Sequence, residues 1–324
     1  MSRTVVTSGK KYIDIDAYGA MVGYAELLKK QGEEAVAVTS GILNESIPPL
    51  ILELGLPLVA DENFKVKPTD SFIMMDTSGS DYMDPIVEID QIVEIIDHHV
   101  SEERAVFWLA RLPADKYQNE HVGAVATQVF ERWEAAGKLE EMTPGIAKAL
   151  LAGILDNTLN LEGEITRERD RVAYHWLMEI AGVDESWNQE YFRQCQELIM
   201  SDLDAAVIND LSVWDEKWSL GKVFCQLTLW DGEQLVSQIR VACEKLLRPR
   251  YGKSWLMNVI DISQQRSYIF SGGDKGTERN MEENCWHGKV KFKDDMAVTL
   301  DRAWMRKELF HELEKSLRGK RGDD

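Results

Sequence analysis

Short apolar runs alternate with longer amphipathic stretches through the first half of the sequence, and this alternation restricts the fold more than any other feature. The run FIMMD is apolar up to its last residue, which is typical of a strand buried on both faces of a sheet. The expected strands are Thr4–Thr7, Ala35–Thr39, Phe72–Asp76, Ile92–Asp97 and Ala105–Leu109. The expected helices are Ala17–Lys30, Gly123–Ala136 and Gly145–Leu155. The pattern predicts an α/β fold, with a parallel sheet wrapped by helices.

A helical region of mixed polarity, Arg167–Asp204, separates this part from a second and smaller α/β unit. The second unit is expected to run strand, helix, strand, strand, a last strand and a terminal helix, with helices at Gly232–Leu247 and Arg302–Leu317. A chain of 324 residues is long for one compact core and has a suitable length for two. We therefore predict two domains, residues 1–195 and 216–324.

Composition excludes several classes of function. Apolar residues make up 44% of the chain, so a globular protein is expected, and the formal charge of −19 argues against binding to long nucleic acids. The N-terminus has no apolar core of a signal peptide, and no stretch approaches a membrane span. The four cysteines form no CxxC pair and are expected to be reduced and mostly buried. These features predict a cytoplasmic protein without a membrane partner.

Carboxylates stand where three of the apolar runs end. Asp14 and Asp16 follow the first strand in IDIDAYGA, and Asp76 closes FIMMD. In parallel sheets ligands gather beyond the carboxyl ends of the strands, so these side chains can share a metal. The alternative for Asp14 and Asp16 is that they only cap the helix that follows them.

Asp97, His98 and His99 close the apolar run QIVEIIDHH and give a stronger signal. Two imidazoles and a carboxylate supply the nitrogen and oxygen ligands that suit divalent transition metals. Asp97 can also orient an imidazole from outside the ligand set. The alternative is a pair of surface histidines in a loop.

The ordered motifs resemble those of the DHH phosphoesterases, in the branch with the second type of C-terminal domain (DHHA2-like). This branch holds the manganese-dependent family II pyrophosphatases and the prune-like exopolyphosphatases. The resemblance rests on IDIDAYGA, GILNESI, Asp76, IIDHH, EHVGAVAT, GILDNTLNL with ITRERD, LVSQIRV and MRKELFHELEK. It spans almost the whole chain and implies a parallel-sheet DHH domain followed by a smaller α/β domain.

The resemblance also implies two metal ions, expected as Mn²⁺ with Co²⁺ or Mg²⁺ as alternatives. The implied ligands are Asp14 and Asp76 for one ion, and Asp16, Asp76 and His98 for the other. His99 would contact a phosphate oxygen or the electrophilic phosphate, and Asp97 is counted with it among the catalytic residues. The implied cations from the second domain are Arg306 and Lys307, which would bind the leaving phosphate. The family also suggests a homodimer.

Two positions depart from the family pattern. Lys10 stands where the first motif has a metal-binding histidine, and Asn157 stands where the fourth motif has a metal-binding aspartate. An ammonium cannot ligate a metal while protonated, so we predict that Lys10 contacts an anionic substrate. Asn157 is also predicted to contact the substrate. The neighbouring Asp156 is predicted to replace it as a metal ligand.

These features predict a metal-dependent hydrolase of a small phosphoanhydride or phosphoester, such as pyrophosphate or short polyphosphate. Hydrolysis would use a water activated by two metals. One alternative is a phosphodiesterase acting on short oligonucleotides or cyclic dinucleotides. The other is a phosphate or nucleotide sensor that has kept the fold and lost turnover.

Overall fold

The computed structural model describes residues 3–213, 222–293 and 296–319. The chain divides into two compact units, which are described separately. Unit 1 comprises Met1–Leu161 and Ile165–Tyr191, and unit 2 comprises Glu162–Glu164 and Phe192–Asp324. The domain limits 1–195 and 216–324 remain predictions, and residues 216–221 lie outside the described residues.

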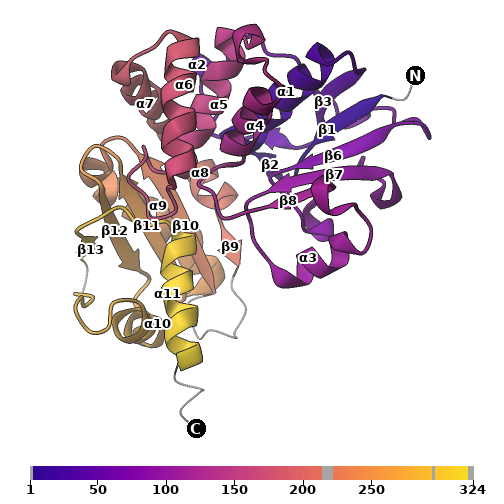
Figure 1. Cartoon of the computed structure of the whole chain (residues 1–324). Coiled ribbons are helices and arrows are strands. Elements are labelled where there is room, and N and C mark those ends of the chain that lie inside the picture. The colour runs from indigo at the N-terminus through magenta and orange to yellow at the C-terminus, as the bar shows by residue number, and fades with distance from the viewer. Residues whose placement is uncertain (1–2, 214–221, 294–295, 320–324) are drawn as a thin grey trace. The chain divides into compact units, whose positions relative to one another are not determined.

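Unit 1 is built on a six-stranded sheet with the order β5-β3-β1-β6-β7-β8 (Figure 1). Its strands are β1 (Thr4–Thr7), β3 (Ala35–Thr39), β5 (Leu58–Ala60), β6 (Ser71–Met75), β7 (Ile92–Asp97) and β8 (Tyr117–Asn119). Every neighbouring pair is parallel, which confirms the predicted sheet. All six carboxyl ends therefore lie at one edge. A separate two-stranded sheet pairs β2 (Tyr12–Ile13) with β4 (Ile42–Leu43).

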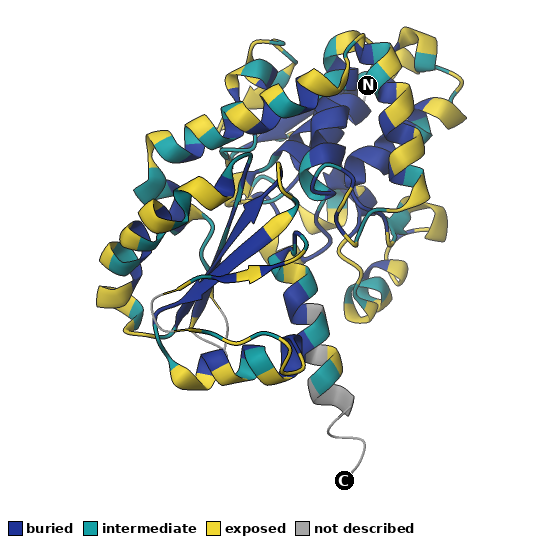
Figure 2. Cartoon of the chain, turned by 90° about the vertical axis from the view of Figure 1, so that its left-hand side faces the viewer, coloured by how far each residue is buried: buried dark blue, intermediate teal, exposed yellow. Residues whose placement is uncertain are grey.

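The helices that follow these strands pack around the sheet. They are α1 (Ile15–Lys30), α2 (Pro49–Leu52), α3 (Glu102–Leu109), α4 (Val125–Ala135), α5 (Pro144–Asn157), α6 (Glu168–Ala181) and the first part of α7 (Glu185–Ser201). Helix α1 is buried along almost its whole length, because it lies against β1 and β3 and is covered by α4 and α5 (Figure 2). A Cβ added at Gly19 would stand 2.6 Å from the Ala149 carbonyl oxygen, so the close approach of α1 and α5 requires a glycine there.

One predicted element is wrong. The run Ala105–Leu109, expected as a strand, forms the last part of α3. Its alternation of exposed Val106 and buried Trp108 also fits a short helix, so periodicity over five residues did not decide the structure. The decisive signal lies just before the run: the Ser101 hydroxyl accepts a hydrogen bond from the Arg104 N–H, and two glutamates fill the first turn.

Unit 2 is a five-stranded mixed sheet with the order β13-β12-β11-β10-β9. Its strands are β9 (Ser212–Val213), β10 (Val223–Leu229), β11 (Trp255–Asp261), β12 (Arg266–Ser271) and β13 (Val298–Leu300). Its helices are α8 (Leu203–Asn209), α9 (Gly232–Tyr251), α10 (Lys275–Asn280), the π-helix η6 (Met281–Cys285) and α11 (Arg306–Gly319). Only β10 and β11 are parallel among the strand pairs described for this unit.

The sheet of unit 2 carries a core on each face, and strand β10 shows why. Val223 and Cys225 point to the core shared with α8 and α9, whereas Phe224 between them packs with Phe310 of α11. The four cysteines are buried and form no disulfide, as predicted. Within the described residues no helix combines the length and apolarity needed to cross a membrane.

Candidate metal centre

The candidate centre lies where two neighbouring strands of unit 1 end. Strands β6 and β7 run parallel with Met75 opposite Ile96, and the Asp76 N–H continues the ladder by donating to the Ile96 carbonyl oxygen at 2.9 Å. Asp76 directly after β6 and His98 directly after β7 therefore stand side by side. This is the edge at which the sequence predicted a ligand site.

Three side chains at this edge have ligand spacing. The Asp76 Oδ1 atom lies 3.4 Å from His98 Nε2 and 3.6 Å from His99 Nδ1. Two ligands about 2.1 Å from a common ion are roughly 3.0–3.5 Å apart, so the Asp76 and His98 atoms suit one divalent ion. Among the described residues, no other group of three or more His, Cys, Asp or Glu side chains meets this spacing.

His98 is held in the orientation that such an ion requires. Its ring is buried, and its Nδ1 lies 3.2 Å from the Val122 carbonyl oxygen, an acceptor. An N–H at Nδ1 would donate to that carbonyl and leave the Nε2 lone pair facing Asp76. The loop that carries Val122 is itself fixed, because the buried Asp170 carboxylate accepts from the Gly123 N–H at 2.9 Å and the Thr127 hydroxyl at 2.6 Å.

Asp97 organises the two histidines from behind. Its Oδ1 accepts from the His98 N–H at 2.7 Å and the His99 N–H at 3.0 Å, and it lies 2.9 Å from His99 Nδ1. Burial of the Asp97 carboxyl raises its pKa, but the hydrogen bonds and the charge of His99 outweigh burial and hold the pKa well below its usual range. Asp97 is therefore a buried anion that positions His99, whose side chain is half exposed.

The backbone of Asp76 is strained in a way that serves the same site. Its φ of +56° lies in the left-handed region, which aspartate enters more easily than most residues. The conformation ends β6 abruptly and keeps the carboxylate at the sheet edge, with its side chain largely buried. Such strain is commonly stored at functional positions.

Asp14 and Asp16 are engaged elsewhere, at helix N-termini. Asp14 caps α1 by accepting from the Ala17 N–H at 2.9 Å. Asp16 is fully buried and accepts from the Val125 and Ala126 N–H groups at 2.8 and 2.7 Å, which caps α4. Asp14 matches the capping alternative weighed from the sequence, whereas Asp16 caps a different helix from the one expected, at a partner 109 residues away.

Asn157 completes the surroundings of Asp16. Its side-chain N–H donates to Asp16 Oδ2 at 2.6 Å, from the last residue of α5. A hydrogen-bond donor thus occupies the side of Asp16 where the family pattern has an acidic residue. Asp156 accepts instead from the Tyr191 hydroxyl at 3.3 Å. The described side chains thus offer the ligand set of one ion at Asp76 and His98.

A family model for the DHH family, N-terminal domain, matches residues 4–154. Over residues 4–154 the chain is thus similar to the DHH family. The match contains the two strand ends, both histidines and the helix α4 that Asp16 caps.

Curated relatives align with longer stretches of the chain at 27–30% identity. A probable manganese-dependent inorganic pyrophosphatase of Deinococcus radiodurans is 30% identical over 176 residues, which cover 53% of this chain and 52% of the relative. A protein of the same name from an Exiguobacterium species is 27% identical over 218 residues, covering 64% and 65%. The chain thus spans about half to two thirds of the length of these curated relatives.

Solved structures share the fold over the whole chain. The putative family II inorganic pyrophosphatase of Methanococcus jannaschii aligns with a TM-score of 0.68 at 20% identity, covering 97% of this chain and 99% of that one. An exopolyphosphatase-related protein from Bacteroides fragilis aligns with a TM-score of 0.51 at 13% identity, covering 98% and 92%. Both confirm the predicted fold class, a parallel-sheet α/β unit followed by a smaller α/β unit.

The three predicted cations, Lys10, Arg306 and Lys307, differ in their exposure. Lys10 is exposed on the segment after β1, where its backbone N–H donates to the Tyr82 carbonyl oxygen at 2.9 Å. In unit 2, Arg306 Nη1 lies 2.7 Å from Asp210 Oδ2 and donates to the Phe224 carbonyl oxygen at 2.8 Å. Lys307 beside it is exposed. The arginine is thus held by its own unit.

Sequence reasoning missed Asn119. This residue ends β8 directly opposite Asp97, and its side-chain N–H₂ group lies 3.1 Å from the His99 carbonyl oxygen and 3.5 Å from Asp97 Oδ2. It fixes the His99 backbone from the edge strand. The available signal was its place just before the EHVGAVAT motif, but a three-residue strand is too short to recognise by periodicity.

Proposed function

We propose that the chain is a metal-dependent hydrolase of a small phosphoanhydride such as pyrophosphate or short polyphosphate, with Asp76 and His98 as ligands of a divalent ion, Mn²⁺ in the first place. The observation that carries the proposal is the 3.4 Å approach of Asp76 Oδ1 and His98 Nε2 at the edge of the sheet. The names of the curated relatives support the choice of metal and substrate.

The side chains of the candidate centre have different roles in the proposed hydrolysis. A bound divalent ion supplies Lewis acidity and a water of lowered pKa. Asp97 keeps Nδ1 of His99 occupied, so the other ring nitrogen of this half-exposed imidazole is left to meet a phosphate oxygen. Lys10 and Lys307 are exposed ammonium groups that would bind the charged oxygens of substrate and product.

The predicted second ion has a weaker basis. It requires Asp14 and Asp16 to turn from the helix N-termini that they cap, and each of these bonds to a charged group is worth about 1.5–3 kcal/mol. Within the proposal, one ion per chain is therefore the expected stoichiometry. The homodimer and the cytoplasmic location predicted from the sequence stay predictions.

Phosphate release and metal content test the proposal together. The full chain, supplied with Mn²⁺, Co²⁺ or Mg²⁺, is assayed against pyrophosphate, tripolyphosphate, a cyclic dinucleotide and short oligonucleotides. We expect release from the phosphoanhydrides and one Mn²⁺ per chain by calorimetry. Asp76→Asn and His98→Ala are expected to lose both, whereas His121→Ala, which removes an exposed imidazole of the same unit, keeps both.

Two outcomes would count against it. Release from the nucleotides alone would favour the phosphodiesterase. Retention of one Mn²⁺ without release from any substrate would favour the sensor.

A further inference from the structure

One peptide group of unit 1 makes hydrogen bonds at both of its ends, and these bonds connect a buried carboxylate with His98. The Val122 carbonyl oxygen lies 3.2 Å from His98 Nδ1. The N–H of the same peptide group belongs to Gly123 and donates to Asp170 Oδ2 at 2.9 Å. Carboxylate, peptide group and imidazole thus form one continuous series, which ends at the Nε2 atom that faces Asp76.

The series is shielded from water. Val122 and Asp170 are 1% and 0% exposed, and the His98 side chain is 2% exposed. Hydrogen bonds are electrostatically stronger inside a protein than in water, and hydrogen bonds in series polarise one another. A negative charge on the carboxylate therefore makes the Val122 carbonyl oxygen a better acceptor for the imidazole.

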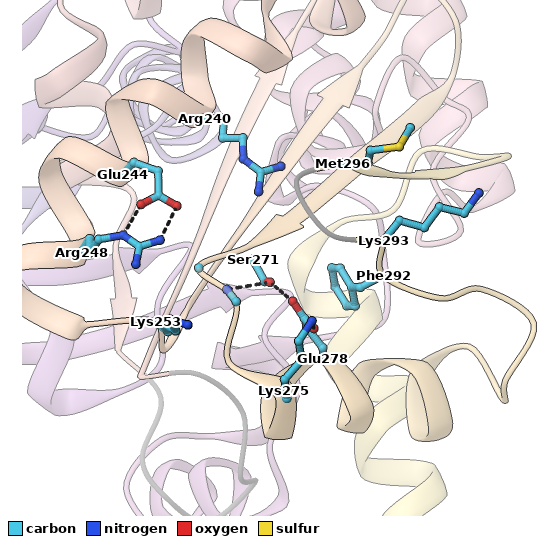
Figure 3. A pocket seen from close by; sticks show the side chains of 12 residues that line it. Arg240, Glu244, Arg248, Lys253, Ser271, Lys275, Glu278, Phe292, Lys293 and Met296 are labelled. Carbon is cyan, nitrogen blue, oxygen red and sulfur yellow. Dashed lines mark hydrogen bonds and ion pairs between the residues drawn. The ribbon is translucent and has the colours of Figure 1, made fainter.

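The hydrogen bonds described for Asp170 come from donors that carry no charge. Besides the peptide N–H, its carboxylate accepts from the Arg167 N–H at 2.7 Å and from the Thr127 hydroxyl at 2.6 Å. Glu278 of unit 2 shows a contrasting arrangement, in which the Lys275 ammonium lies 2.9 Å from the carboxylate (Figure 3). An adjoining cation offsets a negative charge, whereas neutral donors are polarised by it.

A glycine is required for the carboxylate to come this close. A Cβ added at Gly123 would stand 2.6 Å from Asp170 Oδ2 and 2.6 Å from Thr158 Cγ2, so a larger residue would displace the carboxylate from the peptide N–H. Asp170 is also the third residue of α6 and accepts from the Arg167 N–H just before this helix. A role as a helix cap alone is therefore the alternative that an experiment has to separate.

We propose that Asp170 is a positioning residue for the metal ligand His98 and acts through the Val122–Gly123 peptide group. The inference rests on the proposed function, because His98 is a metal ligand only there. A carboxylate that accepts directly from the outer nitrogen of a ligating histidine fixes the ring and raises its basicity. In this chain one peptide group stands between the two. Asp170 favours the proton on Nδ1 and the lone pair on Nε2, and so increases the affinity for a divalent ion.

Asp170→Asn removes the charge and can keep the hydrogen bonds. An asparagine oxygen in the place of Oδ2 still accepts from the Gly123 and Arg167 N–H groups. Its N–H₂ group can donate to the Thr127 hydroxyl oxygen, which reverses that bond. A helix cap and a loop contact are thus retained, whereas the polarising charge is lost.

Asp84→Asn is the matched control. Asp84 is buried in the same unit, and its carboxylate also accepts from neutral donors, the Ser40 N–H, the Ser40 hydroxyl and the Ile86 N–H. This variant removes a buried charge whose described hydrogen bonds end at Ser40 and Ile86.

NMR of the full chain in EDTA, with ¹⁵N in the histidine rings, tests the series without a metal. At about pH 8, above the ordinary imidazole pKa of about 6.5, ¹H–¹⁵N spectra distinguish the two neutral tautomers. The His98 signals are those lost in His98→Ala. We expect the proton on Nδ1 in the wild type. Asp170→Asn should move the Nδ1–H resonance upfield as its hydrogen bond weakens, and Asp84→Asn should leave it unchanged.

Calorimetric titration with Mn²⁺ measures the consequence for metal binding. Loss of a group that hydrogen-bonds a ligating histidine commonly weakens metal binding about 10- to 100-fold, and the inserted peptide group places Asp170→Asn at the lower end, about 10-fold, with less than about threefold for Asp84→Asn. Thermal unfolding in EDTA checks that both variants are folded.

Three results would overturn the proposal. The first is a wild-type His98 that carries its proton on Nε2, which needs no variant. The second is an unchanged Nδ1–H resonance in folded Asp170→Asn, even with weaker Mn²⁺ binding, because the charge would then act through space. The third is an Asp170→Asn variant that binds Mn²⁺ as tightly as the wild type. A wild type that binds no Mn²⁺ contradicts the proposed function instead, and the ring spectra still show whether Asp170 orients His98.

Discussion

Replacement of Asn157 by aspartate tests whether this amide stands in for a cation beside Asp16. In the wild type the Asn157 N–H₂ group donates to Asp16 Oδ2 at 2.6 Å, in a place where Asp16 is fully buried. Asn157→Asp exchanges the donor for a second carboxylate without changing its size. Two unit charges about 3 Å apart repel by roughly 5 kcal/mol at an effective dielectric constant of 20.

The measurable cost is smaller than the full repulsion, because one carboxyl group can stay protonated. Keeping a proton at pH 7 on a carboxyl group whose ordinary pKa is about 4 costs roughly 4 kcal/mol. In a unit of this size, that corresponds to a fall in unfolding temperature of about 8–16 °C in EDTA. Calorimetric unfolding of the full chain measures this fall.

Metal should reverse the loss. A divalent ion that bridges the two carboxylates at 100 times its Kd stabilises the folded state by about 2.7 kcal/mol, which restores most of the wild-type stability. The variant should also bind one more Mn²⁺ than the wild type. Asn63→Asp makes the same chemical change at an exposed position of unit 1 and should do neither. An unfolding temperature in EDTA equal to that of the wild type would refute the reasoning.

Two further predictions concern packing and charge. Gly19→Ala places a methyl group 2.6 Å from the Ala149 carbonyl oxygen, so denaturant titration should show a loss of about 1–3 kcal/mol as α1 and α5 separate. Arg306→Ala leaves Asp210 and the Phe224 carbonyl without their guanidinium donor and should cost about 2 kcal/mol by the same method. Lys307→Ala is its control, because this exposed residue should leave stability unchanged and raise the KM for pyrophosphate.

The sequence was sufficient for the parallel sheet because its central strands are buried on both faces. Ser71–Met75 and Ile92–Asp97 are almost continuously apolar, and each ends on the polar residues that form the candidate centre. The histidine pair and Asp76 could therefore be placed together from strand ends alone. Short elements without a clear hydrophobic periodicity were predicted poorly. Ala105–Leu109, which forms part of α3, is the example.

The surroundings of Asp16 were beyond sequence reasoning for a different reason. Its partners at Val125, Ala126 and Asn157 are more than 100 residues away. No local sequence pattern predicts that a carboxylate caps a distant helix. Only the folded arrangement brings such residues to one place.

Within the proposed function, Lys10 and Asn157 change the charge of the centre in the same direction. The family pattern has a neutral histidine ligand at the first position and an aspartate at the second, so each departure adds one positive charge at neutral pH. Together they equal the charge of one divalent ion. We infer that a centre with one metal and these two side chains can present the same net charge to a phosphate as a centre with two metals. Within the proposed function, the loss of ligands and the gain of charge thus compensate each other, which reconciles the proposed binding of phosphate with capped Asp14 and Asp16.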